Sequence, residues 1–211
     1  MPWQMLCEKT GGILKVIPVN DHGELDLEAY GKLLSDKTKL VSVNYISNAL
    51  GTINPIKKMI TLSKKYNAKF LVDAAQAVSH MEINVQALDC DFLAFSAHKM
   101  FGPTGVGALY ARYELLESMP PVQGGGDMID KVSFEKTTYA LPPQKFEAGT
   151  PNIAGIIGWA PALDYITQIG LKNIAEYEHE LLTYATEKLS SIAPLKIIGT
   201  AKEKASVISF V

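Results

Sequence analysis

The amino-acid sequence predicts an α/β protein with a mostly parallel sheet. Short apolar runs rich in branched residues alternate with longer stretches in which apolar residues recur at helical spacing. Two of the short runs, residues 70–72 and 92–95, are apolar throughout, as expected for strands buried on both faces. Polar side chains follow each of these runs at once, so the ends of two buried strands carry polar groups.

In the first half of the chain, strands and helices are predicted in alternation. Branched residues dominate residues 13–17 and favour a strand. Asp26 can serve as an N-cap, and Asn54-Pro55 can open a helix because proline suits the first turn. The predicted elements are a strand at 12–19, a helix at 26–34, a strand at 39–45, a helix at 54–65, and strands at 68–72 and 92–95.

The second half begins with a turn rich in glycine and proline at residues 102–107, which leads into an apolar run at 108–111. This pattern predicts a further strand that can be antiparallel. Residues 120–143, which contain Gly124-Gly125-Gly126, are expected to be rich in loops. Two long helices at 156–169 and 171–192 are predicted, separated by Gly170, and strand-like runs at 195–198 and 206–211 follow.

The composition is that of an ordinary globular protein. Its 211 residues can form one domain and part of a second, with 47% hydrophobic residues, 20% charged residues and a net charge of −2. This balance gives no electrostatic reason to expect binding to nucleic acid or to a membrane, and no apolar stretch approaches the ~18 residues of a membrane span. Cys7 and Cys90 form no C-x-x-C pair, and the first residues lack the pattern of a signal peptide. We therefore expect a cytoplasmic protein with reduced cysteines.

The run Ser96-Ala97-His98-Lys99, directly after the predicted strand 92–95, carries the strongest chemical signal. Burial lowers the pKa of an amine, and an unprotonated amine can attack an aldehyde to form a Schiff base. The Ser96 hydroxyl and the His98 imidazole can bind phosphate oxygens. The alternatives are a surface lysine in a turn and a structural histidine. The pattern Ser-x-His-Lys-x-x-Gly-Pro separates Lys99 from the other basic residues.

Asp73 and Gln76 follow the other buried strand, and with Lys99 they match the needs of pyridoxal phosphate (PLP). A carboxylate keeps the ring nitrogen of PLP protonated, and an amide can donate to the phenolate oxygen. Asp73 can instead cap a helix that begins at Ala74. Asn48 can hold the same oxygen or a substrate carboxylate, although asparagine is also an ordinary loop former. Together these residues predict a PLP enzyme.

Two other kinds of site are not supported. The glycines of residues 102–107 spell G-x-x-G-x-G and lead into a strand, unlike the dinucleotide fingerprint of a Rossmann module, and no lysine follows them as in a phosphate loop. His22, His80 and His179 show no metal-ligand spacing with one another or with the cysteines. We therefore expect no metal.

A set of longer motifs points to one enzyme family. Ser-x-His-Lys with Asp-x-x-Gln marks the class, whereas Gly-Gly-Gly-x-Met and Phe-Glu-x-Gly-Thr-Pro-Asn narrow it to one branch. The motifs are Pro2-Trp3-Gln4, residues 47–52, 72–77, 88–92, 96–105 and 124–128, and Phe146-Glu147-Ala148-Gly149-Thr150-Pro151-Asn152. Over essentially all 211 residues the chain resembles the class V aminotransferase group of fold-type I PLP enzymes, and within it the SufS-type cysteine desulfurases and selenocysteine lyases.

The resemblance implies a fold and a set of roles. The fold would be an incomplete three-layer α/β/α large domain over residues 1–169, with the start of a small α+β C-terminal domain at 170–211. Thr150 would reach the phosphate bound by the partner subunit of a homodimer. The other implied roles are covalent attachment of PLP by Lys99, pairing with the ring nitrogen by Asp73, contact with the phenolate oxygen by Gln76, phosphate binding by Ser96 and His98, and a place near the substrate side of the ring for Asn48.

The implied reaction converts L-cysteine to L-alanine and leaves the sulfur on an enzyme cysteine as a persulfide. The sulfur would then pass to an acceptor protein for iron–sulfur cluster assembly. The resemblance also implies that these residues are the central part of a longer chain, with the nucleophilic cysteine beyond Val211. Neither Cys7 nor Cys90 matches its position. We therefore expect residues 1–211 alone to be unable to form the persulfide.

Three alternatives remain open at this point. Selenocysteine lyase, with L-selenocysteine as substrate, shares these motifs. The glycine and Phe-Glu-x-Gly-Thr-Pro-Asn motifs argue against another class V activity, such as an aminotransferase or a kynureninase-like hydrolase. A non-catalytic module that keeps PLP or a partner protein is the third, but it has no physical need for Lys99, Asp73, Gln76 and Ser96 together.

Overall fold

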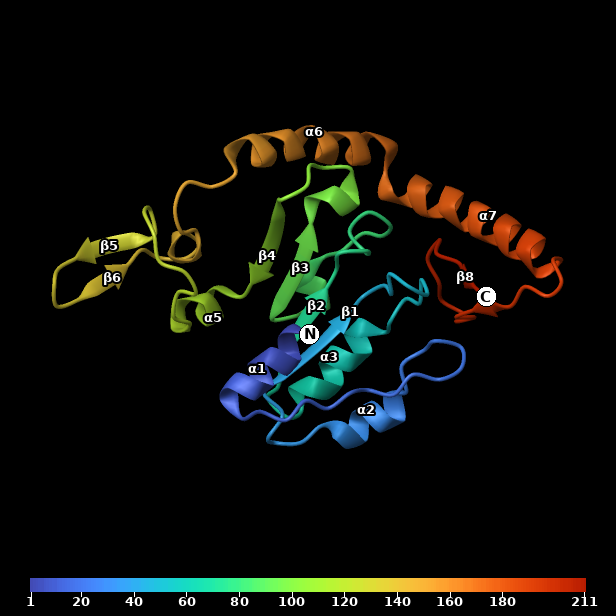
Figure 1. Ribbon diagram of the computed structural model, residues 1–211, viewed down its shortest axis with the longest axis horizontal. Helices are drawn as coiled ribbons and strands as arrows, with labels where there is room; N and C mark the ends of the chain where they lie inside the picture. The colour runs from blue at the N-terminus through green and yellow to red at the C-terminus, as the bar shows by residue number, and fades with distance from the viewer.

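The computed structural model describes all of residues 1–211, and its centre is a four-stranded sheet with the order β1-β2-β3-β4 (Figure 1). Three strands run parallel: β1 (Leu40–Asn44), β2 (Lys69–Asp73) and β3 (Phe92–Ser96). The fourth, β4 (Gly107–Ala111), pairs with β3 in the antiparallel direction. The predicted α/β class, the four strands and the direction of β4 are thus confirmed.

The core lies between this sheet and the helices beside β1 and β2. In β2, Phe70 and Val72 are fully buried. Helix α3 (Ile56–Lys64) places Ile56, Met59 and Ile60 against the same core cluster. Because apolar side chains recur on one face of α3, the helix is stabilised by their burial rather than by its sequence propensity alone.

Helix α2 (Leu27–Leu33) closes the core on the side of α3. Asp26 caps it as predicted, because its carboxylate accepts hydrogen bonds from the backbone nitrogens of Glu28 and Ala29, both at 2.9 Å. The Tyr30 hydroxyl donates to the Met59 carbonyl at 3.0 Å, and burial raises the pKa of this phenol to about 12. Helix α2 is therefore tied to α3 by both packing and a buried hydrogen bond.

The two long helices predicted near the end of the chain are present. Helix α6 (Ile153–Ile169) lies over the turn that follows β3, and α7 (Leu171–Ser190) continues from it towards the C-terminal hairpin (Figure 1). That hairpin consists of β7 (Ile197–Ile198) and β8 (Ser209–Phe210). The division into domains at residues 169 and 170 stays a prediction.

The remaining elements are short. They are α1 (Pro2–Thr10), α4 (Val85–Leu88), α5 (Tyr113–Ser118), the strands β5 (Ile129–Val132) and β6 (Thr137–Tyr139), and the 3-10 turns η1 (Ala97–Met100) and η2 (Gln144–Phe146). None of the helices combines the length and apolar character that a membrane crossing needs.

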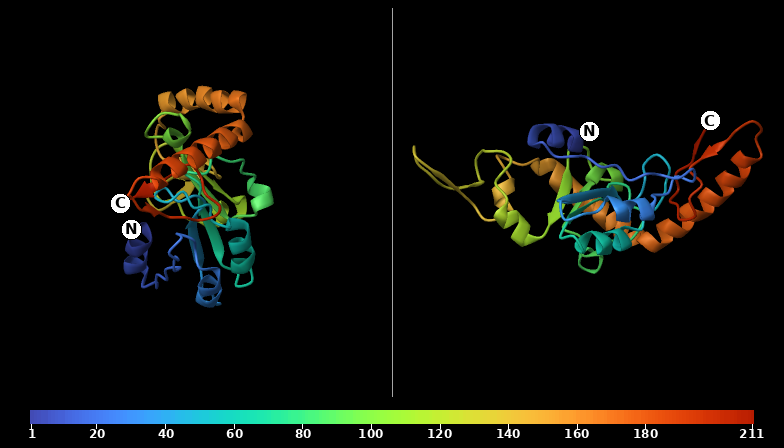
Figure 2. Two further views of the ribbon diagram at one scale, coloured as in Figure 1. Left: turned by 90° about the vertical axis from the view of Figure 1, so that its right-hand side faces the viewer. Right: turned by 90° about the horizontal axis from the view of Figure 1, so that it is seen from below.

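One expectation from the sequence is wrong and another is incomplete. Residues 12–19 form no strand, and only Val19 makes an isolated bridge, to Leu25. This run finds no neighbouring strand, so Ile13 and Val16 stay 86% and 75% exposed. Residues 120–143 are rich in loops as expected, but they also contain the antiparallel pair β5–β6, which was not predicted and which projects away from the central sheet (Figure 2).

Candidate functional site

The carboxyl ends of β1, β2 and β3 lie at one edge of the sheet, which we call the carboxyl edge. Asn44, the last residue of β1, pairs with Asp73, the last residue of β2, and Asp73 pairs with Ala94 of β3. Ser96 ends β3 two residues later. Parallel pairing therefore brings Asp73 and Ser96, far apart in the sequence, to the same edge, where ligands of open α/β sheets bind.

Lys99 and Gln76 meet directly at this edge. The chain leaves β3 through the turn η1, and the Lys99 ammonium nitrogen (Nζ) donates to the Gln76 amide oxygen (Oε1) at 2.6 Å. Both residues are half-buried. Gln76 lies in the turn that follows β2, so this contact joins the two strand ends that the sequence singled out. Because the partner of Lys99 is a neutral amide, the amine is not committed to an ion pair.

Asp73 uses part of its carboxylate to shape the local turn. Its Oδ1 accepts from the backbone nitrogen of Ala75 at 3.0 Å, and residues 75–80 form turns rather than a helix. Asp73 therefore caps a turn, whereas the alternative interpretation from the sequence was that it caps a helix. Asp73 is exposed, and a carboxylate has a second oxygen that this contact does not use. Shaping the turn and binding a ligand are compatible at this residue.

Packing against α6 supports the turn that carries Ser96, His98 and Lys99. The Ala97 nitrogen donates to the Val106 carbonyl at 3.0 Å, and the Gly102 nitrogen donates to the Ala97 carbonyl at 2.9 Å. A β-carbon at Gly102 would lie 2.8 Å from the ring of Trp159 in α6, closer than such contacts allow. The absence of a side chain at Gly102 thus lets α6 press against η1, while His98 itself stays exposed.

Asn48 and Thr150 lie on exposed loops. Asn48 is in the turn that follows β1, between the bridged residues Ile46 and Ile53, and so belongs to the carboxyl edge. Thr150 precedes α6 and follows Gly149, whose nitrogen donates to the Gly126 carbonyl at 3.0 Å. The structure thus brings the two glycine-containing motifs together, but it places neither Asn48 nor Thr150 within hydrogen-bond distance of Lys99.

The residues gathered here fit PLP by their chemistry. The carboxyl edge offers an amine, a carboxylate, an amide, a hydroxyl and an imidazole from Lys99, Asp73, Gln76, Ser96 and His98. These are the groups needed to hold an aldehyde, a ring nitrogen, a phenolate oxygen and a phosphate. Apart from Lys99 with Gln76 and Asp73 with Ala75, these side chains have no hydrogen bond within the chain.

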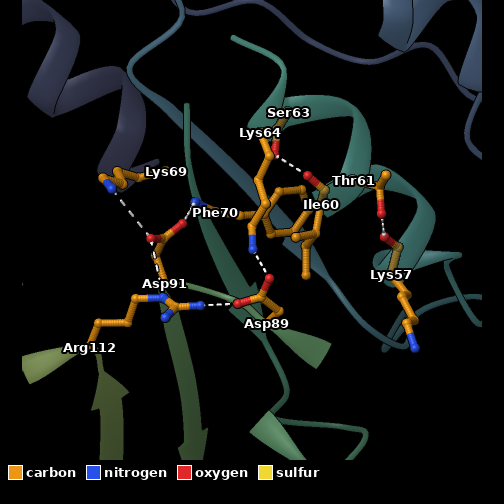
Figure 3. A network of polar contacts seen from close by, with 10 residues as sticks. All are labelled: Lys57, Ile60, Thr61, Ser63, Lys64, Lys69, Phe70, Asp89, Asp91 and Arg112. Atoms are coloured by element: carbon orange, nitrogen blue, oxygen red, sulfur yellow. Dashed lines mark hydrogen bonds and ion pairs between the residues drawn. The ribbon is translucent and has the colours of Figure 1, made fainter. Parts of the chain in front are cut away.

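The opposite edge of the sheet carries a different set of charges (Figure 3). A depression of about 370 Å³ is lined there by Lys64, Asn67, Ala68, Lys69, Asp89, Asp91 and Arg112. Buried Asp91 accepts from the Phe70 nitrogen at 2.9 Å and lies 3.7 Å from the Arg112 guanidinium. Asp89 pairs with both Lys64 and Arg112. Since the charges pair with one another, we assign this amino edge to structure and not to ligand binding.

Neither cysteine is placed for nucleophilic chemistry at the carboxyl edge. Cys90 is fully buried two residues before β3, and burial raises the pKa of its thiol. Cys7 lies in α1 and is half-buried. These positions are those of structural cysteines rather than of reactive ones.

Sequence reasoning missed one set of residues near the carboxyl edge. Residues 199–209 pack on the turn that contains Asn48, and Lys204 donates to the carbonyl of Leu50. The two segments lie about 150 residues apart, beyond the range of any local pattern. No signal in the sequence identified this contact.

Comparison with known proteins gives a consistent result. Residues 1–211 match the family described as aminotransferase class-V. The chain is 56% identical, over its whole length, to a cysteine desulfurase of Synechococcus elongatus, of which it covers 34%. It covers 52% of the crystal structure of the cysteine desulfurase CsdA from Escherichia coli, with a TM-score of 0.94 and 34% identity. It also covers 53% of the apo structure of a cysteine desulfurase from Thermococcus onnurineus, with a TM-score of 0.93 and 43% identity. The chain thus spans from about a third to just over half of the length of these relatives.

Proposed function

The chain belongs to the class-V aminotransferase family, and from this we propose that it forms part of a PLP-dependent cysteine desulfurase. The observation that carries the proposal is the hydrogen bond between Lys99 and Gln76 at the carboxyl edge, beside Asp73. It brings together the two motifs that predicted PLP. The relatives named as cysteine desulfurases, at 51% to 56% identity over the whole chain, support the choice of reaction.

In this proposal the residues of the carboxyl edge act on different parts of the cofactor. Bound PLP would supply an electron sink for the negative charge that develops at the α-carbon of an amino acid. Lys99 would hold the aldehyde carbon and afterwards carry the proton at the substrate α-carbon. Asp73 would keep the ring nitrogen protonated, because a carboxylate favours the charged form of its neighbour. Gln76 would donate to the phenolate oxygen, and Ser96 and His98 would bind the phosphate.

The proposed substrate is L-cysteine and the product is L-alanine. The carbon–sulfur bond of the substrate breaks, its sulfur forms a bond with an attacking thiolate, and the substrate carbon receives a proton. Because Cys90 is buried and Cys7 lies in α1, we propose that this thiolate comes from outside residues 1–211. Selenocysteine lyase would use the same residues, but the relatives and structures reported above are cysteine desulfurases.

The setting of the reaction is also proposed. We infer a homodimer in which Thr150 reaches the phosphate site of the partner subunit. Its exposure and its lack of contact with Lys99 of its own chain support this role. Transfer of the sulfur to an acceptor protein for iron–sulfur cluster assembly, in the cytoplasm, completes the proposal.

The absorption spectrum after PLP is added and the excess removed tests the cofactor site. We expect a visible band of lysine-bound cofactor in the parent protein and in Lys57→Ala, which removes an exposed lysine of α3. The band should be absent from Lys99→Ala. A band that survives in Lys99→Ala would contradict the role of Lys99, and no band in the parent protein would contradict the proposed function.

A further inference from the structure

The turn that carries Asn48 is held by a segment far along the chain. Three consecutive carbonyls of this turn accept hydrogen bonds from residues 204–209. The pairs are Ala49 with the Ser209 hydroxyl, Leu50 with the Lys204 ammonium, and Gly51 with the Ala205 nitrogen, the last at 2.8 Å. Because backbone carbonyls in a turn usually face water, three internal partners in a row indicate a built contact.

The same segment also pairs with the end of the turn. The Ile53 nitrogen donates to the Glu203 carbonyl at 2.9 Å, and Thr52 forms an antiparallel bridge with Lys204. On its other side, the Thr52 hydroxyl donates to the Gly23 carbonyl at 2.9 Å. The turn therefore lies between residues 20–24 and residues 199–209, with hydrogen bonds to both.

Steric fit makes this contact specific. The Leu50 side chain lies between two glycines, and a β-carbon at Gly23 or Gly199 would come within 2.6 or 2.9 Å of it. Gly51 has a φ of +76°, and a β-carbon there would lie 2.7 Å from the Ala205 carbonyl oxygen. The approach is closer than any residue with a side chain would allow at these positions.

Lys204 stands out within this contact because its half-buried ammonium has no carboxylate partner. It donates instead to two carbonyls, those of Leu50 and Gly199, the latter at 3.0 Å. Burial lowers the pKa of this amine. Hydrogen bonds from a charged donor are stronger than neutral ones, so the two carbonyls can offset the desolvation of the charge.

The turn of residues 47–52 is also attached to the carboxyl edge. The Tyr45 nitrogen donates to the Asp73 carbonyl at 2.8 Å, and the buried Asn54 amide donates to the Asn44 carbonyl at 2.8 Å. A displacement of residues 47–52 would therefore act close to the strand end that carries Asp73. The position of Asn48 depends on the contacts on both sides of the turn.

We infer that Lys204 is a positioning residue that fixes residues 47–52 at the carboxyl edge and so sets the place of Asn48. Through it, residues 199–209 become part of the support of the cofactor site. The significance for the cofactor rests on the proposed function, whereas the effect on the turn does not.

The test compares Lys204→Met, which keeps the length of the side chain and removes its donors, with Lys202→Met as the matched control. Lys202 is exposed in the same segment, and only its backbone nitrogen has a partner, Glu24. We expect backbone amide exchange of residues 47–53 to become about tenfold faster in Lys204→Met, with α3 unchanged. Lys204→Arg should restore part of the protection, because its guanidinium can still donate to carbonyls.

A second measurement addresses the cofactor. The dissociation constant of PLP should rise roughly three- to tenfold in Lys204→Met, whereas the band at saturating PLP should persist because Lys99 is intact. Should Lys204→Met not fold, Ser209→Ala removes only the donor to Ala49 and should accelerate exchange of the same residues by a smaller factor.

The outcomes separate the two claims. Unchanged exchange of residues 47–53 in Lys204→Met, or the same change in Lys202→Met, would overturn the positioning role. Faster exchange in a protein that shows no PLP band at all would support the positioning role and contradict the proposed function. Faster exchange with unchanged PLP affinity would restrict Lys204 to the turn and overturn its link to the cofactor site.

Discussion

The two edges of the central sheet carry similar numbers of polar side chains but use them differently. At the amino edge, Asp89 and Asp91 are paired with Lys64, Lys69 and Arg112, and Asp91 also accepts from a backbone nitrogen. At the carboxyl edge, Lys99 meets only a neutral amide, Asp73 is exposed, and His98 has no partner. The first edge satisfies its charges internally, whereas the second leaves them available.

This difference distinguishes the edge that stabilises the fold from the edge that can bind a ligand, without reference to any relative. A charge that is paired within the chain gives a ligand little to bind, because its partner would first have to be displaced. An amine beside an amide, with a carboxylate one strand away, offers free groups at fixed positions. The depression of about 370 Å³ lies at the amino edge, where the charges are already paired, so a hollow in the surface does not by itself mark a site with free groups.

The largest effect on stability is expected at the amino edge, from Asp91→Ala. This change leaves the Phe70 nitrogen without an acceptor and removes the carboxylate that faces Arg112 and Lys69. We expect a loss of about 2–4 kcal/mol in the free energy of unfolding, measured by urea denaturation. Asp36→Ala, at an exposed position without an ion pair, is the control. A loss no greater than that of the control would contradict the structural assignment of this edge.

At the carboxyl edge, Gln76→Leu should show the reverse pattern. It removes the oxygen that accepts from Lys99 and the amide proposed to meet the cofactor, at similar side-chain volume. We expect roughly tenfold weaker binding of PLP, with a change in unfolding free energy below about 1 kcal/mol. Gln86→Leu, at an exposed position in α4, should change neither. A large loss of stability in Gln76→Leu with unchanged PLP affinity would contradict the proposal that the carboxyl edge serves ligand binding and the amino edge serves stability.

The smallest effect concerns the pH dependence of the exposed ion pairs. A hydrogen bond from Lys64, aided by Arg112 and opposed by partial burial, holds the pKa of Asp89 below its ordinary value of 3.8. The stabilisation by Asp89 is therefore present above that value and is lost as the pH falls through the lowered one. The difference in urea midpoint between the parent protein and Asp89→Asn should be measurable at about pH 7 and should shrink at about pH 3. A difference that does not change with pH would show that the ion pairs contribute nothing.

The part of the fold that is predictable from the sequence is the part set by local pattern. The runs around Phe70 and Leu93 were correctly predicted as strands, although only Phe70, Val72 and Leu93 are buried and the other residues of these runs are half-buried. Asp26 and Asn54-Pro55 correctly indicated where α2 and α3 begin. The contact between Lys99 and Gln76 also follows from pattern, since parallel strands deliver their ends to a common edge.

The features that were missed depend on distant partners. Residues 12–19 have the composition of a strand but no neighbour to pair with, and an unpaired strand is not stable. The pair β5–β6 is short and flanked by glycine and proline, so its pattern resembles that of a loop. Nothing in the sequence distinguishes Lys204 from the other lysines, and its contact with Leu50 is formed only in the folded chain.

The contact between Lys204 and Leu50 spans 154 residues, and this separation has a consequence for the order of events during folding. The strands β1 to β4 lie within residues 40–111, and the longest connection between consecutive strands, residues 45–68, is far shorter than 154 residues. Closing a loop as long as that between Leu50 and Lys204 costs more conformational entropy and contributes to slow folding. Pulse-labelling during refolding should therefore find the amides of β2 and β3 protected before those of residues 51–53. The turn that carries Asn48 would then be among the last parts of the molecule to reach its final form.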